Sequence, residues 1–303
     1  MGITKHHEHV LDRAAMLTIR GFIKLSAAPP MTPEGRPGYD ELIARTSAPE
    51  GVSWTEGEVG GVPGWWCHPD DAAPGRAILY LHGGGFVIGS AAAYRGLASQ
   101  IAARARGATF VAEYRLAPEH PFPAAFEDAG RALAGLQSAG FTTVATVGDS
   151  AGGGLALAAL ASGANQAVAA ALFSPYIDLS HSGESMTSRA DVDPILSPAT
   201  LQQAADQYLN GADPRDPRVN AMAGDLSSLP PIRIDVGEDE ILLDDSLRFE
   251  AAARSANVPC EVHVWQGMVH VFPTNIAMLK AASEALDGVG AFLEAAFDRA
   301  RLA

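Results

Sequence analysis

The sequence has few cysteines and no long hydrophobic run. Only two cysteines, Cys67 and Cys260, occur among 303 residues, and their wide separation indicates neither a disulfide framework nor a zinc site. No apolar run approaches the roughly 18 residues that a membrane span needs, and the polar first residues do not resemble a secretory signal. We therefore expect buried, reduced thiols, no membrane span and a cytoplasmic protein.

Basic residues are also scarce, with 21 Lys and Arg against 35 Asp and Glu and a formal net charge of −14. Nucleic acids and anionic membranes bind clustered Lys and Arg, so neither is an expected partner. No lysine follows a glycine, which excludes a P-loop, and no G-x-G-x-x-G is complete. His6, His7 and His9 lack a matching downstream cluster, so a helix start is favoured over a metal site, and no cofactor is expected.

A G-x-S-x-G pattern occupies residues 148–152, between a β-branched run at 142–147 and an alanine-leucine run that begins at Leu155. In a nucleophile elbow a strand turns sharply into a helix and exposes a serine hydroxyl, while small neighbours let both backbones pass. Because glycine and serine are common in this chain, the pattern can also arise by chance. The strand, turn, helix order around it makes Ser150 the predicted nucleophile.

A second glycine cluster, His-Gly-Gly-Gly-Phe at 82–86, directly follows the apolar run 77–81. Three consecutive glycines cost backbone entropy and need a reason. Bare peptide N–H groups of such a loop can point at a developing oxyanion, together with the N–H of Ala151. A flexible surface turn is the alternative. His82 is expected to orient this loop rather than to react.

A serine nucleophile needs a histidine base and an acid that orients it, which follow in the chain order Ser, acid, His. His181 precedes every candidate acid, and His263 lies inside an expected strand. His270 follows the end of that strand, where active-site loops of parallel sheets gather, and is the predicted base. The loop 237–245 offers five carboxylates, and spacing alone does not choose among them.

From residue 77 onward, strand and helix patterns alternate, which predicts an α/β fold with a mostly parallel sheet and helices on both faces. The expected strands are at 77–82, 108–113, 142–147, 167–173, 231–236 and 260–265. The expected helices are at 92–106, 123–138, 153–162, 242–256 and 275–298. Before them the patterns predict helices at 8–25 and 39–45 and a hairpin of strands 52–59 and 62–66.

Residues 176–228 break this alternation with a polar, proline- and aspartate-rich stretch and one expected helix at 198–209. The stretch is too long for an ordinary connection. We expect it to form a helical cap over the strand ends together with residues 1–50, which leaves 51–303 as the catalytic domain. Met16, Leu17, Phe22 and Leu25 are candidates for an apolar wall of the site, and core packing explains each of them equally well.

Four motifs resemble the hormone-sensitive-lipase-like branch of the α/β-hydrolase esterases, and the likeness covers residues 77–272. They are His-Gly-Gly-Gly-Phe at 82–86, Tyr-Arg-Leu-Ala-Pro-Glu at 114–119 with Phe-Pro-Ala at 122–124, Gly-Asp-Ser-Ala-Gly-Gly at 148–153, and His-Val-Phe at 270–272. The resemblance implies an α/β-hydrolase fold with a helical cap. It also implies that the N–H groups of Gly83, Gly84 and Ala151 bind the oxyanion.

The same resemblance points to the acid. That family usually carries aspartate in a G-x-x-D-x-L-x-D loop, which falls here on Gly237, Glu240, Leu242 and Asp244. This sequence departs from the pattern, because glutamate stands at the acid position. We assign the acid to Glu240, since the longer side chain still reaches an imidazole, and keep Asp239 and Asp244 as alternatives.

The implied activity is hydrolysis of small-molecule esters with short-to-medium acyl chains. The reaction passes through an acyl-enzyme, with Ser150, His270 and Glu240 as the triad. Opening of a lactone by the same residues is an alternative, because segments 193–197 and 213–218 resemble lactone-hydrolase-like members. A non-catalytic binder that kept the fold is a further alternative. Members of the family often dimerise through an edge strand, which we expect near 259–265.

Overall fold

The computed structural model describes residues 2–26, 28–163 and 167–302. They form a nine-stranded sheet with the order β1-β9-β8-β7-β6-β4-β5-β3-β2. Only β3 runs antiparallel to its neighbours, β5 and β2, so the predicted mostly parallel α/β sheet is confirmed. The strands are β1 (Gly2–His6), β2 (Val52–Val59), β3 (Val62–Pro69), β4 (Arg76–Leu81), β5 (Ala108–Ala112), β6 (Thr143–Asp149), β7 (Ala170–Phe173), β8 (Ile232–Gly237) and β9 (Cys260–Trp265).

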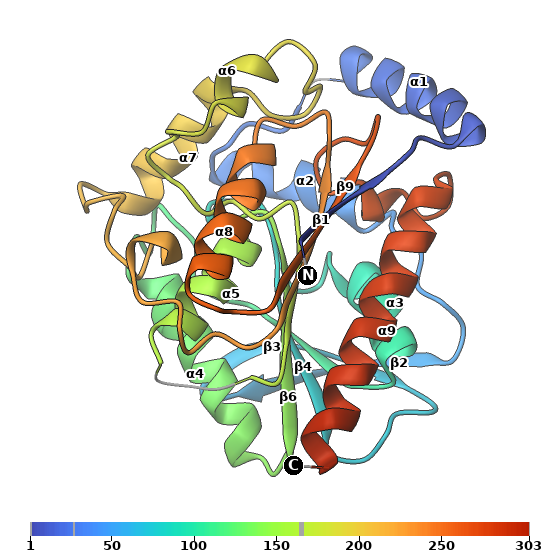
Figure 1. Cartoon of the computed structure of the whole chain (residues 1–303), viewed down its shortest axis with the longest axis vertical. Coiled ribbons are helices and arrows are strands. Elements are labelled where there is room, and N and C mark those ends of the chain that lie inside the picture. Colours follow the sequence, from blue (N-terminus) through green and yellow to red (C-terminus); the bar gives the residue numbers. More distant parts are fainter. Residues whose placement is uncertain (1, 27, 164–166, 303) are drawn as a thin grey trace.

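Helices cover both faces of the sheet (Figure 1). On β4, Leu79 and Leu81 pack into the same cluster as α4 (Ala124–Ser138), α5 (Ala151–Ala161) and α8 (Leu243–Ser255). Ile78 and Tyr80 point the other way, into the cluster of α3 (Arg95–Ala105) and α9 (Lys280–Leu302). This alternation is the two-residue period of a strand buried on both faces. The helix α9 begins later than the predicted 275, because Phe272–Asn275 form a short 3-10 turn.

The first described residues form a strand, which the sequence did not predict. β1 pairs in parallel with β9, and His6 lies in it with Nε2 2.8 Å from Nδ1 of His263. The His6 ring stacks on Trp265 at 3.8 Å between centroids. The prediction that His6 belongs to a helix start is therefore wrong, whereas His9 occupies the N-cap position of α1 (Val10–Leu25).

The position of β1 also corrects the predicted dimer contact near 259–265. Strand β9 is paired on one side with β8 and on the other with β1. Its backbone N–H and C=O groups are therefore engaged within this chain, and it is not an edge strand that a second copy could extend. The described sheet ends instead at β1 and β2.

The remaining helices lie together at one end of the molecule, at the top of Figure 1. They are α1, α2 (Arg36–Ile43), α6 (Ser185–Ser188) and α7 (Pro198–Leu209). Side chains join the N-terminal segment to the 176–228 segment: Arg20 donates to Val192 O at 2.8 Å and Gln207 to Met31 O at 2.8 Å. These contacts support our proposal that residues 1–50 and 176–228 act as one cap. The short helix α6 was not predicted.

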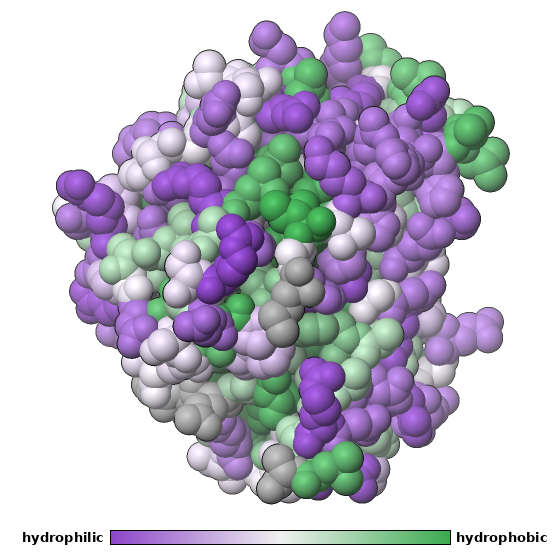
Figure 2. Space-filling model, viewed as in Figure 1, coloured by the Kyte–Doolittle hydropathy of each residue, from purple (hydrophilic) through white to green (hydrophobic). Residues whose placement is uncertain are grey.

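The α1 helix turns one side to the protein and the other outward. Met16 is buried with Trp265 and Met268, whereas Leu17 and Leu25 are 71% and 89% exposed. Figure 2 shows hydrophobic side chains gathered at the upper right, where α1 lies. Phe22 is also exposed, at 51%, so Met16 is the buried member of the four apolar wall candidates, and it lies beside the loop that carries His270.

The two cysteines are buried and lie far apart in the sheet. Cys67 on β3 and Cys260 on β9 are buried free thiols, and five strands separate them in the sheet. Burial raises their pKa values to about 11 and about 12. Among the helices formed by the described residues, none combines the length and apolarity that would let it cross a membrane.

Candidate active site

Ser150 stands at the turn between β6 and α5. Its backbone has φ 51° and ψ −122°, a left-handed region that costs a non-glycine residue energy and is typical of a nucleophile elbow. The flanking glycines are needed because a Cβ on Gly148 would lie 2.5 Å from Gly152 O, and one on Gly152 would lie 2.0 Å from Leu81 O. The pattern at 148–152 therefore folds into the strand, turn, helix geometry that it predicts.

The backbone of Ser150 is fixed while its hydroxyl is not. Its N–H donates to Phe173 O at 2.9 Å, and its carbonyl accepts from Tyr176 N at 2.8 Å. The residue is 7% exposed. Among the described residues, no hydrogen bond engages Ser150 Oγ, so the strained turn presents a hydroxyl that is free to react.

Glu240 contacts His270. Its Oε2 lies 2.7 Å from His270 Nδ1, and its Oε1 accepts from Gly237 N at 2.6 Å and from Ser174 Oγ at 2.7 Å. The carboxylate is fully buried, and His270 is 8% exposed. Ser174 also accepts the N–H of Val271 at 3.1 Å, so one hydroxyl ties the acid to the residue after the histidine. Sequence reasoning missed Ser174, whose only signal is its position just after β7.

The other carboxylates of the 237–245 loop have different partners. Asp239 accepts from Arg20 at 2.6 Å, and Asp244 accepts from Ser185 N at 2.9 Å. Asp245 accepts the N–H groups of Ile177 and Asp178. Within the part of the chain that the structure describes, Glu240 is the only one of the five that hydrogen-bonds to His270.

Two opposing effects act on the His270 imidazole. Burial lowers its pKa, while the hydrogen bond and the negative charge of Glu240 raise it, and the net result is a pKa above the ordinary 6.5. The carboxylate therefore stabilises the imidazolium, which is what a base needs once it has accepted a proton.

The glycine loop corrects one predicted oxyanion donor. The N–H of Gly83 donates to Asp149 Oδ1 at 3.0 Å and is thus already engaged. Gly84 has φ +112°, and a Cβ there would lie 2.1 Å from Ile88 O. In the described residues no hydrogen bond engages the N–H groups of Gly84, Gly85 or Ala151. The donor set that the structure leaves free is therefore Gly84 and Ala151, with Gly85 in place of Gly83.

Asp149 is a buried acid that sequence reasoning missed. Besides Gly83 N, it accepts from Tyr80 OH at 2.7 Å and Tyr94 OH at 3.0 Å, and burial raises its pKa to about 6. The ring of His82 stacks at 5.4 Å on Tyr94, and burial lowers the pKa of His82 to about 4, which keeps it neutral. A carboxylate between Gly148 and the nucleophile, in an otherwise apolar strand end, was the available signal.

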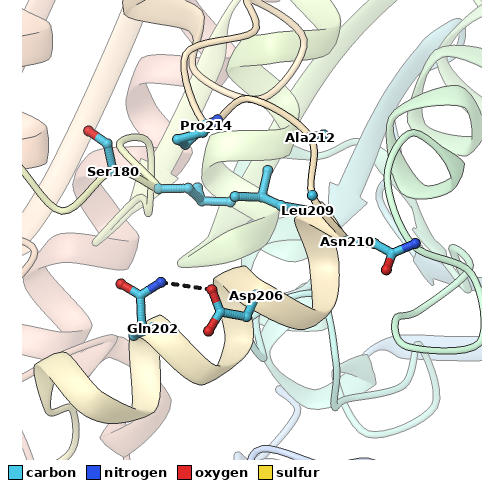
Figure 3. Close-up of a pocket in the computed structure, with 9 residues that line it drawn as sticks. Ser180, Gln202, Asp206, Leu209, Asn210, Ala212 and Pro214 are labelled. Atoms are coloured by element: carbon cyan, nitrogen blue, oxygen red, sulfur yellow. Dashed lines mark hydrogen bonds between the residues drawn. The ribbon is translucent and has the colours of Figure 1, made fainter.

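The other two histidines considered as the base, His263 and His181, lie away from Ser150 and have other partners. His263 pairs with His6, and His181 hydrogen-bonds to Tyr176 OH and Gln202 Oε1. Gln202 also lines a cavity of about 540 Å³, in which it donates to Asp206 at 2.8 Å (Figure 3). Ser150 and its predicted partners do not line this cavity. No three His, Cys, Asp or Glu side chains of the described residues are grouped to hold a metal ion.

Comparisons with known proteins place the chain in a family. The sequence model of one family, described as alpha/beta hydrolase fold, matches residues 78–274. An acetyl-hydrolase of Streptomyces hygroscopicus is 40% identical over 244 residues, which are 78% of this chain and 81% of the relative.

Solved structures are similar over most of the chain. An esterase from the bacterial hormone-sensitive lipase family has a TM-score of 0.87 and 34% identity and covers 94% of this chain and 97% of its own. The esterase EstE5, soaked with p-nitrophenyl butyrate, has a TM-score of 0.86 and 33% identity, with 94% and 99% covered.

Proposed function

We propose, on the premise that this chain belongs to the α/β-hydrolase family and is a serine carboxylesterase of its hormone-sensitive-lipase-like branch, that it hydrolyses short-to-medium acyl esters with Ser150, His270 and Glu240. The branch predicted from the four motifs is confirmed by these comparisons. The observation that carries the residue assignment is the 2.7 Å contact of His270 with a fully buried Glu240, on the loops that follow β9 and β8, two strands that are neighbours in the sheet.

The first half of the reaction forms the acyl-enzyme. Because Glu240 accepts a hydrogen bond at Nδ1 of His270, the imidazole carries its proton there and offers Nε2 as the base. Nε2 takes the proton of Ser150 while Oγ bonds to the ester carbonyl carbon. The carbonyl oxygen becomes an oxyanion, and the N–H groups of Gly84, Gly85 and Ala151 donate to it.

The first half ends when the alcohol leaves, and the second half releases the carboxylic acid. The tetrahedral intermediate collapses, the bond to the alcohol oxygen breaks, and His270 gives that oxygen the proton it took from Ser150. A water molecule then passes a proton to His270, and its oxygen bonds to the acyl carbon. When the bond between that carbon and Ser150 Oγ breaks, His270 returns the proton to Oγ, which leaves the carboxylic acid and restores the serine. The same three side chains and the same oxyanion donors serve both halves.

The cap limits the room beside the oxyanion loop. A Cβ placed on Gly85 would lie 3.0 Å from Ala204 Cβ and 3.1 Å from Met31 Sδ. The next residue, Phe86, stacks on Tyr208 of α7 at 3.9 Å. Both segments of the cap thus close directly over the loop. This closure, together with the similar acetyl-hydrolase and the butyrate ester soaked into EstE5, supports short acyl chains.

A series of p-nitrophenyl esters of increasing acyl length tests the proposed substrate class. We expect kcat/KM to be highest for acetyl to hexanoyl esters and to fall with longer chains, because each added methylene must displace cap side chains. The measurement is initial release of p-nitrophenol at several ester concentrations. A preference for acyl chains beyond about ten carbons would contradict the proposal, as would faster turnover of a γ-lactone than of any linear ester.

The pH profile tests the role of His270. The base acts only when neutral, so kcat/KM should rise with pH through the pKa of His270 and level off above it. Because Glu240 holds that pKa above 6.5, the midpoint of the rise should also lie above 6.5. The measurement is kcat/KM for p-nitrophenyl butyrate from about pH 5 to about pH 9. Activity that is flat across this range would exclude a histidine base.

A further inference from the structure

Side chains from the N-terminal helix α2 contact the segments that hold the oxyanion loop. Arg36 donates from Nε to Val87 O at 2.9 Å, next to the residues of the glycine cluster. The same guanidinium donates to Ala117 O at 3.0 Å. One turn further along the helix, the hydroxyl of Tyr39 lies 2.7 Å from that of Tyr94. Arg36 and Tyr39 are three residues apart, so both side chains extend from one side of the helix.

The Tyr39 contact continues to the loop as an unbroken chain of hydrogen bonds. Tyr94 OH donates to Asp149 Oδ2 at 3.0 Å, and Asp149 Oδ1 accepts the N–H of Gly83 at 3.0 Å. Asp149 directly precedes Ser150, and Gly83 directly precedes the free N–H of Gly84. The chain therefore links α2 to the nucleophile on one side and to the oxyanion donors on the other.

The residues that follow α2 hold it against α3. A Cβ on Gly96 would lie 1.9 Å from Thr46 O, which shows how closely the two backbones approach. Gln100 donates to Ser47 O at 2.6 Å. Since Tyr94 is the N-cap of α3, the contacts at Thr46 and Ser47 hold Tyr39 in register with Tyr94.

We propose that Tyr39 and Arg36 are positioning residues of the oxyanion hole, so that the N-terminal segment sets the rate of turnover as well as covering the substrate. Gly84 and Gly85 have positive φ values and no side chains, so backbone contacts hold these donors. The carbonyl of Gly84 accepts from Val87 N at 3.1 Å and from Ile88 N at 3.0 Å. Arg36 in turn holds Val87 through its carbonyl, and Asp149 holds Gly83 on the other side of the donors. An oxyanion donor displaced by about 1 Å loses most of its effect. The inference rests on the proposed function.

The variants Tyr39→Phe and Tyr94→Phe test this chain, because each removes one hydroxyl and keeps the ring. We expect Tyr39→Phe to lower kcat for p-nitrophenyl butyrate by roughly five- to tenfold, with KM changed less than about twofold. The Ki of a trifluoromethyl ketone, whose adduct with Ser150 carries an oxyanion, should rise by the same factor. The double variant should be no slower than Tyr94→Phe alone, since both act through Asp149.

Arg36→Met and Arg45→Met form a matched pair for the second anchor. Arg45 pairs with Glu41 at 3.0 Å, in the same segment but away from the loop. We expect Arg36→Met to lower kcat roughly tenfold and to raise the Ki of the trifluoromethyl ketone by the same factor. Arg45→Met should change neither quantity. Thermal unfolding of each variant reports its folding.

Three outcomes would overturn the inference: an unchanged kcat in folded Tyr39→Phe, a change confined to KM, or effects of Tyr39→Phe and Tyr94→Phe that multiply. Each of these presupposes a wild-type protein that hydrolyses the ester. A wild-type protein without ester hydrolysis would instead overturn the proposed function, so the two failures are distinguishable.

Discussion

Replacing Ser150 with alanine should abolish ester hydrolysis, with a loss in kcat on the order of 10⁶-fold. The substitution removes the oxygen that forms the acyl-enzyme, and the remaining groups have no nucleophile to activate. The oxyanion donors and the bound substrate still supply a small residual rate through direct attack by water. The measurement is p-nitrophenyl butyrate hydrolysis, corrected for the rate without protein.

The alanine variant should remain folded, so that the loss reports chemistry. Alanine meets the same φ of 51° that Ser150 tolerates, and the hydroxyl makes no hydrogen bond among the described residues. The free energy of unfolding should therefore change by less than about 0.5 kcal/mol. An organophosphonate should label the wild-type protein once and leave the variant unlabelled. Turnover by the variant above about one per cent of the wild-type rate would show that another residue is the nucleophile.

The sequence predicted the elbow turn at Ser150 well because this turn demands particular residues at short spacing. The turn at Ser150 needs small neighbours on both sides, and the backbone O atoms that lie 2.5 Å and 2.0 Å from Cβ positions on Gly148 and Gly152 show why. The parallel strands were equally visible, since strands buried on both faces are continuous apolar runs. Local sequence therefore contained most of the fold and the elbow.

What the sequence did not predict depends on partners that are far apart in the chain. The strand β1 is five mostly polar residues whose pairing with β9 leaves no local pattern, and overlooking it led to the wrong edge strand. The N–H of Gly83 faces inward because Asp149, 66 residues later, accepts it. The hydrogen bond between Tyr39 and Tyr94 likewise joins residues that are far apart in the chain. The sequence around each tyrosine predicts only a helix.

The acid is the member of the proposed triad that most needs a direct test. Glu240→Gln should lower kcat for p-nitrophenyl butyrate by about 10³- to 10⁴-fold. Both oxygens of Glu240 accept hydrogen bonds, one from Gly237 N and Ser174 Oγ and the other from His270. A glutamine keeps only one oxygen, and when Gly237 and Ser174 bind it, the NH₂ group faces Nδ1. The imidazole proton then moves to Nε2, which can no longer act as the base.

The matched variants Asp239→Asn and Asp244→Asn separate this effect from a general loss of charge in the loop. Their carboxylates accept from Arg20 and from Ser185 N, so each should change kcat by less than about threefold. The residual activity of Glu240→Gln should also begin to rise at lower pH than that of the wild type, because the charge that raises the pKa of His270 is gone. A larger loss in Asp239→Asn or Asp244→Asn than in Glu240→Gln would assign the orienting role to that aspartate.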